Sequence, residues 1–551
     1  MKEKIYEPGE CYDYQLTLDK LLRTPLTYAP DREIVYRDRY RYTYRDLIER
    51  IHRLAAGLSA IGINKGDKVC IFDYDSPRYL ETYFAVPMMG AVMHMMNWRS
   101  SPEQIMYMIN HARDKAVIIH EDFLPLLDEI WDQLETVETI VVISDGGSKY
   151  HTALPIDIDY EEMLADASLP HRFPHIDEDD TATMFYTTGT TGLPKGVHFT
   201  HKQLMLHVMS ETVMTGSYHS IGRFHSNDVY MPITPMFHVH AWGFPYVATM
   251  LGTKQVYPGK YEPEMLLKLI EKEGVTFSHC VPTVLRMILS HPRAEDVHLQ
   301  GWKVVVGGSS FPVALAKQAL DKGIEAYDGY GMSETCPLLC IGNLKPHMME
   351  WDNDRKAEIV TKTGLPLPLV DLRIIDSAGN FLPHDGRRTG ELVVRAPWAT
   401  RSYYDEPEMT KELWRDGWLH TKDIALIDNE GYVTVTDRLK DVIKTGGEWV
   451  SSLDLENCAT QHEAVAEAAA VGIPDEKWGE RPVIMATLKE AYRGKIESDE
   501  IRNFLRSFVD QGVIPRYGMP DRVILVDAIP KTSIGKYNKI EIRRIMEESC
   551  I

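Results

Sequence analysis

The fold of this chain is limited above all by one turn-rich segment, Tyr186-Thr187-Thr188-Gly189-Thr190-Thr191-Gly192-Leu193-Pro194-Lys195-Gly196. The segment holds three glycines, four threonines and one lysine, and the run before it, Thr181–Tyr186, is typical of a β-strand. Glycines let backbone N–H groups approach a ligand, threonine hydroxyls donate hydrogen bonds, and a lysine ammonium offsets negative charge. A plain surface loop is the alternative, but four hydroxyls beside Gly-Leu-Pro-Lys-Gly favour a polyphosphate site.

The segment is not a Walker A loop, because no Gly-Lys-Ser/Thr follows the first glycine at the required spacing. Short β-branched runs alternate with helical stretches, which indicates a parallel, doubly wound α/β architecture. The predicted strands are 69–72, 116–119, 139–143 and 304–306, and the predicted helices are 101–111, 263–272 and 313–322. We therefore expect an α/β nucleotide fold other than that of the P-loop NTPases.

The second half of the chain changes character twice. From Lys362 on, strands over 372–375, 391–394 and 432–436 predict a small antiparallel β-barrel. The last part predicts a small α+β domain, with strands over 464–471 and 482–488 and a helix over 498–508 N-capped by Ser498. A chain of 551 residues also exceeds the roughly 250–300 at which single cores stop growing. We predict an N-terminal domain over 1–437 and a C-terminal domain over 438–551.

Charge and cysteine usage exclude several function classes. A net charge of −21 would repel nucleic-acid phosphates, and no apolar run reaches the about 20 residues of a membrane span. Seven scattered cysteines suit a reducing cytoplasm, and Cys336 and Cys340 lack the second pair that a zinc site would need. The N-terminus lacks the apolar core of a signal peptide. We expect a cytoplasmic protein that acts on small molecules.

Four further motifs carry chemistry. Asp328-Gly329-Tyr330-Gly331-Met332-Ser333-Glu334-Thr335 combines a ring that can stack on a base, a hydroxyl for a phosphate and a carboxylate for Mg²⁺. Gly417-Trp418-Leu419-His420-Thr421-Lys422-Asp423, followed by Asp437-Arg438, offers an acidic acceptor for ribose hydroxyls. The last two are Lys444-Thr445-Gly446-Gly447-Glu448-Trp449 and Pro530-Lys531-Thr532-Ser533-Ile534-Gly535-Lys536. Taken one at a time, these motifs have structural alternatives: Tyr330 as a core tyrosine, Asp423 as a turn residue and Lys536 as a solvated lysine.

Together with the first segment, these blocks resemble the adenylate-forming superfamily of acyl-CoA synthetases, luciferases and adenylation domains, in order and over nearly the whole chain. Medium- and long-chain fatty-acyl-CoA synthetases are the most similar group. Three stretches carry that resemblance: Gly90-Ala91-Val92-Met93-His94, Pro235-Met236-Phe237-His238-Val239-His240-Ala241-Trp242, and Gly446-Gly447-Glu448-Trp449-Val450-Ser451-Ser452. The resemblance implies an ATP-dependent acid–CoA ligase that forms acyl-AMP and pyrophosphate, then passes the acyl group to CoA and releases AMP.

The resemblance also implies a set of nucleotide and CoA contacts. Thr187 and Glu334 would lie at the Mg²⁺, and Ser333 would contact the α-phosphate. Ser333 and Thr188 stand where many relatives have threonine and serine, and each keeps the hydroxyl. Tyr330 would stack on adenine. The residues expected to bind ATP or CoA are Thr187, Thr188, Gly189, Thr190, Thr191, Gly192, Lys195, Gly308, Ser309, Asp328, Gly329, Tyr330, Ser333, Asp423, Arg438, Lys440, Gly446, Gly447 and Trp449.

Three side chains are expected to act in the chemistry: His238, Lys444 and Lys536. His238 would lie over the substrate carboxylate; a core histidine, or a metal pair with His240 that lacks a third ligand, is the alternative. Lys536 would bridge the carboxylate and the α-phosphate, where charge builds during attack.

The family's domain movement follows from the same resemblance. After pyrophosphate leaves, the mobile C-terminal domain would rotate about Lys440, which removes Lys536 and presents Lys444, Gly446 and Gly447 to CoA. Glycines there would leave room for a narrow pantetheine tunnel. Trp449 would gate a fatty-acid tunnel, or alternatively pack within the small domain.

Other functions compete with the fatty-acid reading. An aryl or cyclic acid, or an acceptor other than CoA, would keep the same fold. A serine hydrolase of the penicillin-binding type would use Ser533-Ile534-Gly535-Lys536 and Lys444-Thr445-Gly446, but their order here is reversed. A non-catalytic binding protein would not need the acidic and lysine residues of the motifs. The expected partners are a small carboxylic acid, ATP, Mg²⁺, CoA and a second copy of the chain, with no nucleic acid.

Overall fold

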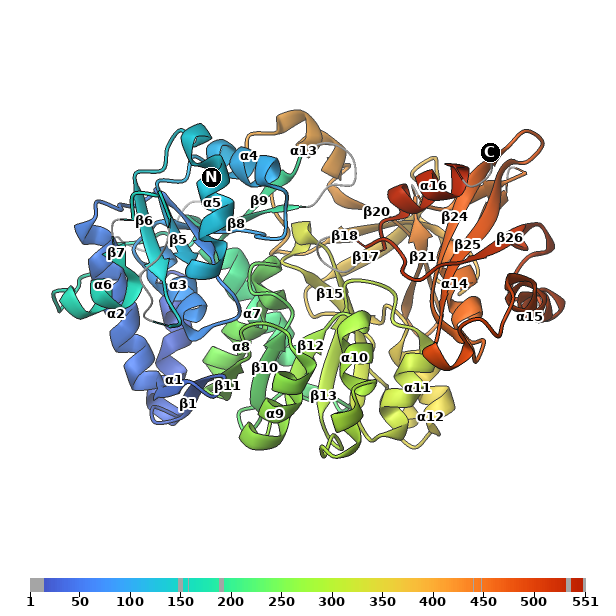
Figure 1. Cartoon of the computed structure of the whole chain (residues 1–551), viewed down its shortest axis with the longest axis horizontal. Helices are drawn as coiled ribbons and strands as arrows, with labels where there is room; N and C mark the ends of the chain where they lie inside the picture. Colours follow the sequence, from blue (N-terminus) through green and yellow to red (C-terminus); the bar gives the residue numbers. More distant parts are fainter. Residues whose placement is uncertain are drawn as a thin grey trace, which may run out of the picture. The chain divides into compact units, whose positions relative to one another are not determined.

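The computed structural model describes residues 14–146, 152–156, 158–187, 193–439, 441–446, 448–531 and 537–548, without the side chains of Glu448 and Trp449. The chain divides into two compact units. Figure 1 shows their helices and strands, coloured along the sequence. The first is built from residues up to Thr187, from Pro194–Met209 and from Pro235–Gly259. The second is built mainly from Ser210–Thr234 and from the chain that begins at Lys260.

The first unit has a seven-stranded sheet in the order β7-β6-β5-β3-β4-β8-β9. Its strands are β3 (Lys68–Phe72), β4 (Val92–Met95), β5 (Ala116–His120), β6 (Thr139–Ile143), β7 (Ile158–Asp159), β8 (Thr181–Thr187) and β9 (Lys195–Thr200). Neighbouring strands are parallel except β8 and β9, which are antiparallel. Continuous apolar runs such as Val117–Ile119 suit this sheet, because parallel strands are buried on both faces.

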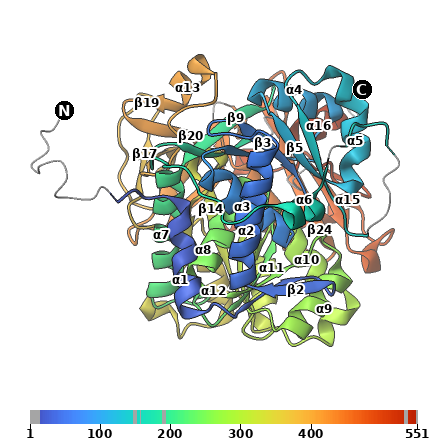
Figure 2. The same cartoon turned by 90° about the vertical axis from the view of Figure 1, so that its left-hand side faces the viewer.

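Helices and a second group of strands complete the first unit. The strands are β1 (Glu33–Tyr36), β2 (Tyr40–Thr43) and β11 (Lys254–Tyr257), in the order β11-β1-β2. The helices are α1 (Arg23–Tyr28), α2 (Tyr44–Ala60), α3 (Pro77–Met88), α4 (Pro102–Ala112), α5 (Leu124–Ile130), α6 (Tyr160–Asp166) and α8 (Phe244–Leu251). A capping box between Thr43 and Asp46 starts α2, which runs beside α3 (Figure 2).

The second unit contains a largely parallel run of strands in the order β16-β15-β14-β13-β12-β10. These are β10 (Val229–Ile233), β12 (Phe277–Cys280), β13 (Lys303–Gly307), β14 (Glu325–Gly331), β15 (Leu338–Ile341) and β16 (Leu365–Pro366). The helices are α9 (Pro263–Glu273), α10 (Pro282–Leu289), α11 (Val313–Asp321) and α12 (Asn353–Val360), and α7 (His201–Ser217) carries residues of both units.

Two smaller sheets follow in the second unit. Antiparallel pairing joins β17 (Asp371–Ile375), β18 (Gly390–Arg395), β19 (Trp414–Arg415), β20 (Trp418–Ile427) and β21 (Val433–Arg438), and α13 (Pro407–Leu413) precedes β19. The last sheet contains β22 (Ile443–Thr445), β23 (Glu448–Val450), β24 (Val465–Asp475), β25 (Gly479–Leu488) and β26 (Arg522–Leu525). Its helices are α14 (Ser452–Thr460), α15 (Ser498–Asp510) and α16 (Lys539–Glu548).

The predicted fold class is confirmed: α/β subdomains, an antiparallel β region and a small α+β domain follow one another along the chain. The predicted N-cap of α15 is wrong, because the cap position is Glu497 and makes no side-chain capping hydrogen bond. Asp499 and Glu500 in the first turn instead place negative charge near the positive end of the helix dipole. No helix in the described ranges is long and apolar enough to span a membrane.

Candidate functional site

The predicted phosphate loop joins two paired strands of the first unit. Thr187 ends β8 and Lys195 begins β9, and the two are register partners in the antiparallel pair. Strand β8 is anchored below them, because the Tyr186 hydroxyl lies 2.7 Å from Nδ1 of His111. Thr188, Gly189, Thr190, Thr191 and Gly192 lie outside the described residues. The hairpin thus brings the two ends of the loop together.

His238 lies half-buried at the start of an unusual turn in the first unit. Val239, His240, Ala241, Trp242 and Gly243 all have positive φ, at 49°, 58°, 46°, 61° and 89°. Left-handed backbone costs an L-residue about 1–2 kcal/mol, and such strain clusters at functional sites. The chain before the turn is held in place: Met236 N donates to Asp75 Oδ1 (2.9 Å), and the Tyr83 hydroxyl donates to the Met236 carbonyl (2.5 Å).

The neighbouring His240 has a different environment. It is fully buried, and its Nε2 lies 2.7 Å from the Thr183 hydroxyl. Burial lowers the pKa of His240 to about 3. The core-histidine reading considered for His238 therefore describes His240, which is neutral near neutral pH.

The second unit places several predicted nucleotide contacts at the carboxyl ends of parallel strands. Gly308 (φ 80°) and Ser309 directly follow β13, and Gly307 is in register with Gly329 of β14. Open α/β sheets bind ligands at this edge. Asp328 is buried beside Gly329, and burial raises the pKa of its carboxyl well above the ordinary range.

Tyr330, Asp423 and Arg438 are in direct contact within this unit. The Tyr330 hydroxyl donates to Asp423 Oδ2 at 2.6 Å, and Nε of Arg438 lies 3.2 Å from Asp423 Oδ1. Asp423 and Arg438 are register partners on β20 and β21. Burial, and then the charge of Asp423, raises the pKa of Tyr330, so its hydroxyl remains a donor. The structure therefore brings together the residues predicted for the base and the ribose.

The acidic residue of the Tyr330 motif has a partner that the sequence did not reveal. Ser333–Thr335 form a short 3₁₀ turn, and Glu334 is only 8% exposed. Glu334 Oε1 accepts from the Tyr403 hydroxyl at 2.6 Å, and its carbonyl accepts from Thr400 N at 2.7 Å. Burial, and then the charge of Glu334, raises the pKa of Tyr403. A carboxylate held in this way offers a hard oxygen ligand of the kind that Mg²⁺ takes.

The predicted CoA-side residues lie on β22 and its turn. Lys444 is exposed, and its backbone N–H donates to Glu480 Oε2 at 2.8 Å. Gly446 has φ 62° and donates to the Trp478 carbonyl at 2.7 Å, and an added Cβ would lie 2.9 Å from the Trp478 ring. Both features favour glycine there. The backbone of Trp449 pairs with Lys444, whereas Lys440, Gly447 and Lys536 lie outside the described residues.

Buried polar contacts lie on both sides of position 440. The sequence did not predict these contacts. The Ser452 N–H donates to Asp437 Oδ2 at 2.6 Å, and the Ser451 hydroxyl donates to the Thr436 carbonyl at 2.5 Å. Lys539 of α16 pairs with Glu456 at 2.8 Å, and both side chains are nearly buried. Serine and lysine are common in loops and helices, so nothing in their spacing marks these contacts.

Three potential metal ligands also meet inside the sheet of the first unit. Atoms of Cys70, His94 and Asp114 lie within 4.8 Å of one another, and all three side chains are fully buried. His94 Nδ1 lies 2.6 Å from Asp114 Oδ2. Burial raises the pKa of the Cys70 thiol and of the Asp114 carboxyl, which favours their protonated forms. In the described part of the chain the group is a buried polar cluster of the core, built on the hydrogen bond between His94 and Asp114.

Comparison with known proteins identifies a family that binds AMP, which agrees with the contacts among Tyr330, Asp423 and Arg438. Residues 23–404 match the family described as AMP-binding enzyme, and residues 454–536 match the AMP-binding enzyme C-terminal domain. The chain is 39% identical over 543 residues to a long-chain-fatty-acid–CoA ligase of Thermus thermophilus, which covers 97% of this chain and 96% of that protein. It is 34% identical to a medium-chain-fatty-acid–CoA ligase of Ectopseudomonas oleovorans, over 97% of both chains. The crystal structure of the anthranilate CoA ligase AuaEII with anthranoyl-AMP has the same fold, with a TM-score of 0.84, 22% identity and coverage of 98% of this chain and 99% of that chain.

Proposed function

Because the chain belongs to the AMP-binding enzyme family and is an acyl-CoA synthetase, we propose that it activates a medium- or long-chain fatty acid. ATP and CoA are the other substrates of such ligases. The observation that carries the proposal is the similarity, over almost the full length, to two ligases named for fatty acids. The contact of Tyr330 with Asp423 and Arg438 supports the use of ATP, because it joins a ring to an acceptor for ribose hydroxyls.

In this proposal the adenine stacks on Tyr330, and the ribose hydroxyls donate to Asp423. Each carboxylate oxygen has two lone pairs, so Asp423 can accept from a ribose while it also holds Tyr330 and Arg438. The loop between Thr187 and Lys195 holds the leaving pyrophosphate, and Ser333 contacts the α-phosphate. Glu334, oriented by Tyr403, and Thr187 would hold Mg²⁺, which would offset the phosphate charge.

His238 and Lys536 take the chemical roles that the family resemblance implies for them. Attack of the carboxylate on the α-phosphate forms the acyl-AMP bond and releases pyrophosphate. Lys536 bridges the two reacting groups, and His238 lies over the carboxylate. The strained turn after His238 supports its role, since strain of this kind is kept where geometry matters.

We further propose a domain boundary between Asp437 and Arg438, with Lys440 as the hinge. Rotation about it exchanges Lys536 for Lys444 and Gly446, so that the CoA thiol attacks the acyl carbonyl and AMP leaves. The five buried free cysteines in the described part of the chain support a reducing cytoplasm as its location. We propose a homodimer as the assembly.

A screen of pyrophosphate release tests the substrate. The purified enzyme is given Mg·ATP with saturated fatty acids from short to long and with aryl acids such as benzoate and anthranilate. We expect the highest kcat/KM for a medium or long chain. A clear preference for an aryl acid would replace the fatty-acid assignment, and failure of every carboxylate to yield acyl-AMP would reject adenylation itself.

Separate assays of the two half-reactions test the hinge. Lys536→Ala should abolish acyl-AMP formation but leave thioester formation from supplied acyl-AMP and CoA nearly unchanged. Lys531→Ala is the matched control, because Lys531 lies in the same motif and pairs with Glu467 on the surface at 2.8 Å. Equal loss of both half-reactions in Lys536→Ala would contradict the domain rotation.

A further inference from the structure

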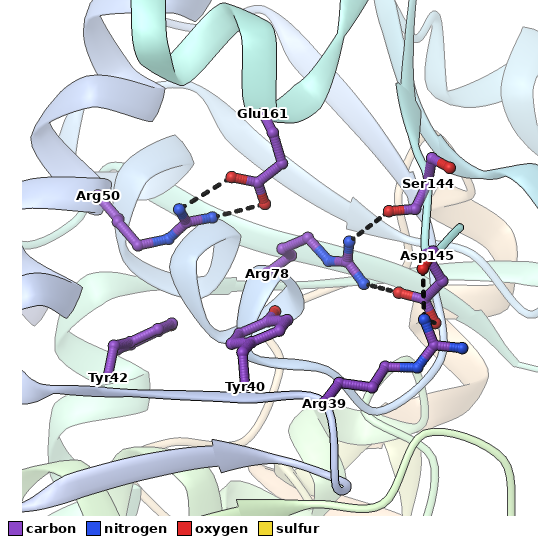
Figure 3. Close-up of a pocket in the computed structure, with 8 residues that line it drawn as sticks. All are labelled: Arg39, Tyr40, Tyr42, Arg50, Arg78, Ser144, Asp145 and Glu161. Atoms are coloured by element: carbon purple, nitrogen blue, oxygen red, sulfur yellow. Dashed lines mark hydrogen bonds and ion pairs between the residues drawn. The ribbon is translucent and has the colours of Figure 1, made fainter. Parts of the chain in front are cut away.

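The first unit contains a cavity that the reaction does not use. It has a volume of about 320 Å³, within the range of small-molecule sites, and none of its lining residues belongs to the set proposed for ATP, CoA or the acid (Figure 3). Its walls come from the β1–β2 hairpin, α2, α3, α6 and the end of β6. The cavity therefore needs an explanation of its own.

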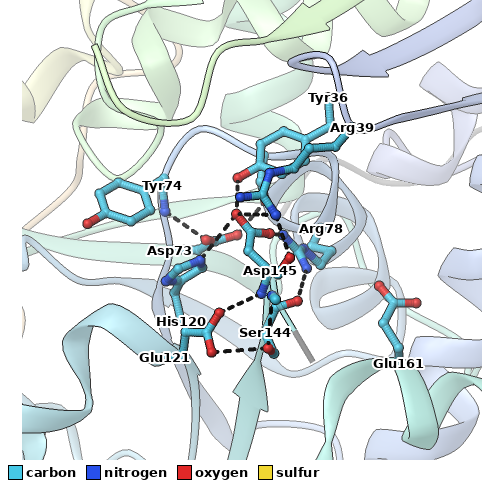
Figure 4. Close-up of polar contacts among 12 residues, drawn as sticks. Tyr36, Arg39, Asp73, Tyr74, Arg78, His120, Glu121, Ser144, Asp145 and Glu161 are labelled. Carbon is cyan, nitrogen blue, oxygen red and sulfur yellow. Dashed lines mark hydrogen bonds and ion pairs between the residues drawn. The ribbon is translucent and has the colours of Figure 1, made fainter. Parts of the chain in front are cut away.

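The cavity lies beside a topological switch in the parallel sheet. The chain leaves β3 for β4 on one side and then returns to β5 on the other side, in the order β4-β3-β5-β6-β7. Open α/β sheets bind ligands outside the carboxyl ends of their strands near such a switch. Asp73 follows β3, His120 ends β5 and Asp145 follows β6 (Figure 4). Nε2 of His120 lies 3.5 Å from Asp145 Oδ2, so these strand ends form one polar edge.

Guanidinium groups form one wall of the cavity. Arg78 is 2% exposed, donates from Nη1 to the Ser144 carbonyl at 3.0 Å and pairs through Nη2 with Asp145. Within the ranges that the structure describes, its Nε has no hydrogen-bond partner, and neither has the buried hydroxyl of Tyr40. Buried donors without partners are rare, and both belong to lining residues. Arg39, at the hairpin, adds a 43%-exposed side chain that contacts the Asp145 carbonyl and lies 3.7 Å from its carboxylate.

Rings and carboxylates form the rest of the lining. Tyr40 and Tyr42 are two residues apart on β2 and therefore lie on the same face of the strand. Their rings stack, with the ring centres 6.2 Å apart and an angle of 16° between the ring planes. The Arg50 guanidinium lies 5.6 Å from the Tyr42 ring centre and makes two hydrogen bonds with Glu161, at 2.9 and 2.8 Å. Figure 3 shows these groups around the same space as Arg78 and Arg39.

We propose that this cavity binds a nucleoside phosphate at a site separate from the catalytic one. The phosphate lies against the exposed guanidinium of Arg39, whose planar fork suits phosphate oxygens, and beside the Nε–H of Arg78. The ribose hydroxyls donate to the carboxylates of Asp145 and Glu161, and the base stacks on Tyr40 and Tyr42. Arg39 is exposed enough to turn from the Asp145 carbonyl to the ligand.

Calorimetric titration of the full-length protein with UMP, GMP and inorganic phosphate tests the site. We expect Arg39→Gln to weaken binding of the nucleotides and of phosphate at least tenfold. Tyr42→Leu should weaken the nucleotides by a similar factor and leave phosphate unchanged. Tyr42→Phe loses the 2.8 Å hydrogen bond to Glu81 but keeps the ring. Because the base stacks on the ring, this variant should bind nucleotides as the wild type does.

Two controls fix the location. Arg41→Gln removes an arginine of the same hairpin that pairs with Glu33 at 3.0 Å outside the cavity, and should leave binding unchanged. Asp423→Asn alters the proposed ribose contact of the catalytic site. It should also leave binding of UMP and GMP at the cavity unchanged. The proposal is overturned if neither nucleotide binds, if phosphate alone binds, or if binding survives Arg39→Gln and is lost in Asp423→Asn. Because none of these titrations uses acyl-CoA formation, their failure is distinct from failure of the proposed ligase function.

Discussion

At the scale of single residues, Asp423 joins the two halves of the proposed nucleotide contact. One carboxylate oxygen holds the Tyr330 hydroxyl and the other holds Arg438. Asp423 itself is only 5% exposed, so its charge is poorly solvated by water and depends on these partners. A ribose that donates to the same oxygens would complete the set.

Asp423→Asn should raise the KM for ATP about tenfold or more. A hydrogen bond to a charged acceptor contributes about 1.5–3 kcal/mol, and 1.4 kcal/mol corresponds to a factor of ten. Initial rates of pyrophosphate release at varied ATP measure it. Asp371→Asn, an exposed aspartate on β17, is the control and should leave the KM unchanged. An unchanged KM in Asp423→Asn would remove Asp423 from the ribose site.

Tyr403→Phe should raise the Mg²⁺ concentration that gives half-maximal activity by about 3- to 10-fold. The variant keeps the ring but leaves Glu334 Oε1 without its 2.6 Å donor, and a net hydrogen bond of this kind contributes about 1 kcal/mol. A structural role alone would lower stability without moving the Mg²⁺ dependence. The Mg²⁺ titration, run beside a thermal melt, separates the two cases.

Much of the candidate site was visible in the sequence at this scale, but the contacts that orient it were not. Tyr330, Asp423 and Arg438 stand in motifs, and the structure brings them into contact. Tyr403 stands in an ordinary Tyr-Tyr pair, and it reaches Glu334 across 69 positions of the chain. Local spacing carries no information about such a partner, because only tertiary packing determines it.

At the scale of elements, β14 positions Tyr330 through close packing of its glycines. An added Cβ at Gly329 would lie 2.6 Å from Val305 Cγ1, and one at Gly331 would lie 2.0 Å from the Pro337 carbonyl oxygen. The first neighbour is a side chain on β13, whereas the second is backbone. The two glycines therefore predict different responses to the same substitution.

Gly329→Ala should destabilise the protein by about 1–3 kcal/mol, the usual cost of overpacking, and raise the KM for ATP. Val305→Ala removes the methyl groups that the new Cβ meets, so the double variant should recover part of both losses. Gly331→Ala has no such rescue, because its clash is with backbone. Urea unfolding and ATP kinetics on the single and double variants measure the coupling; strictly additive effects of Gly329→Ala and Val305→Ala would contradict this packing.

The presence and type of the helices and strands were predicted better than the residues at which they end. The predicted strands 116–119 and 139–143 lie within β5 and β6, because runs of β-branched residues in a parallel sheet are unambiguous. The N-cap of α15 was misassigned by one residue, since Ser498 is a good cap by type but already belongs to the helix. Helix ends depend on local hydrogen bonds that composition does not specify. The left-handed turn after His238 had no sequence signal, because its Val239, Ala241 and Trp242 disfavour positive φ.

At the scale of the whole molecule, burial of histidines couples stability to pH. His207, His240 and His279 are fully buried, and burial lowers the pKa of each to about 3. In the unfolded chain a histidine has a pKa of about 6.5. Between these two values the unfolded chain binds protons that the native chain does not, so acid favours unfolding.

The contribution of these three histidines to the free energy of unfolding should therefore be complete above about pH 6.5 and be lost as the pH is lowered toward 3. Each of these histidines contributes a slope of about 1.4 kcal/mol per pH unit within that window. Urea midpoints followed by tryptophan fluorescence from about pH 7.5 to about pH 5.5 measure the slope. His279→Phe keeps a ring beside Tyr230 but loses the 2.8 Å contact with its hydroxyl, so it should lower stability throughout while it reduces the slope by one histidine's share. His219→Gln alters an exposed histidine and should reproduce the wild-type slope. A wild-type slope in His279→Phe would mean that this histidine is protonated equally in both states, and would assign the acid sensitivity to other groups.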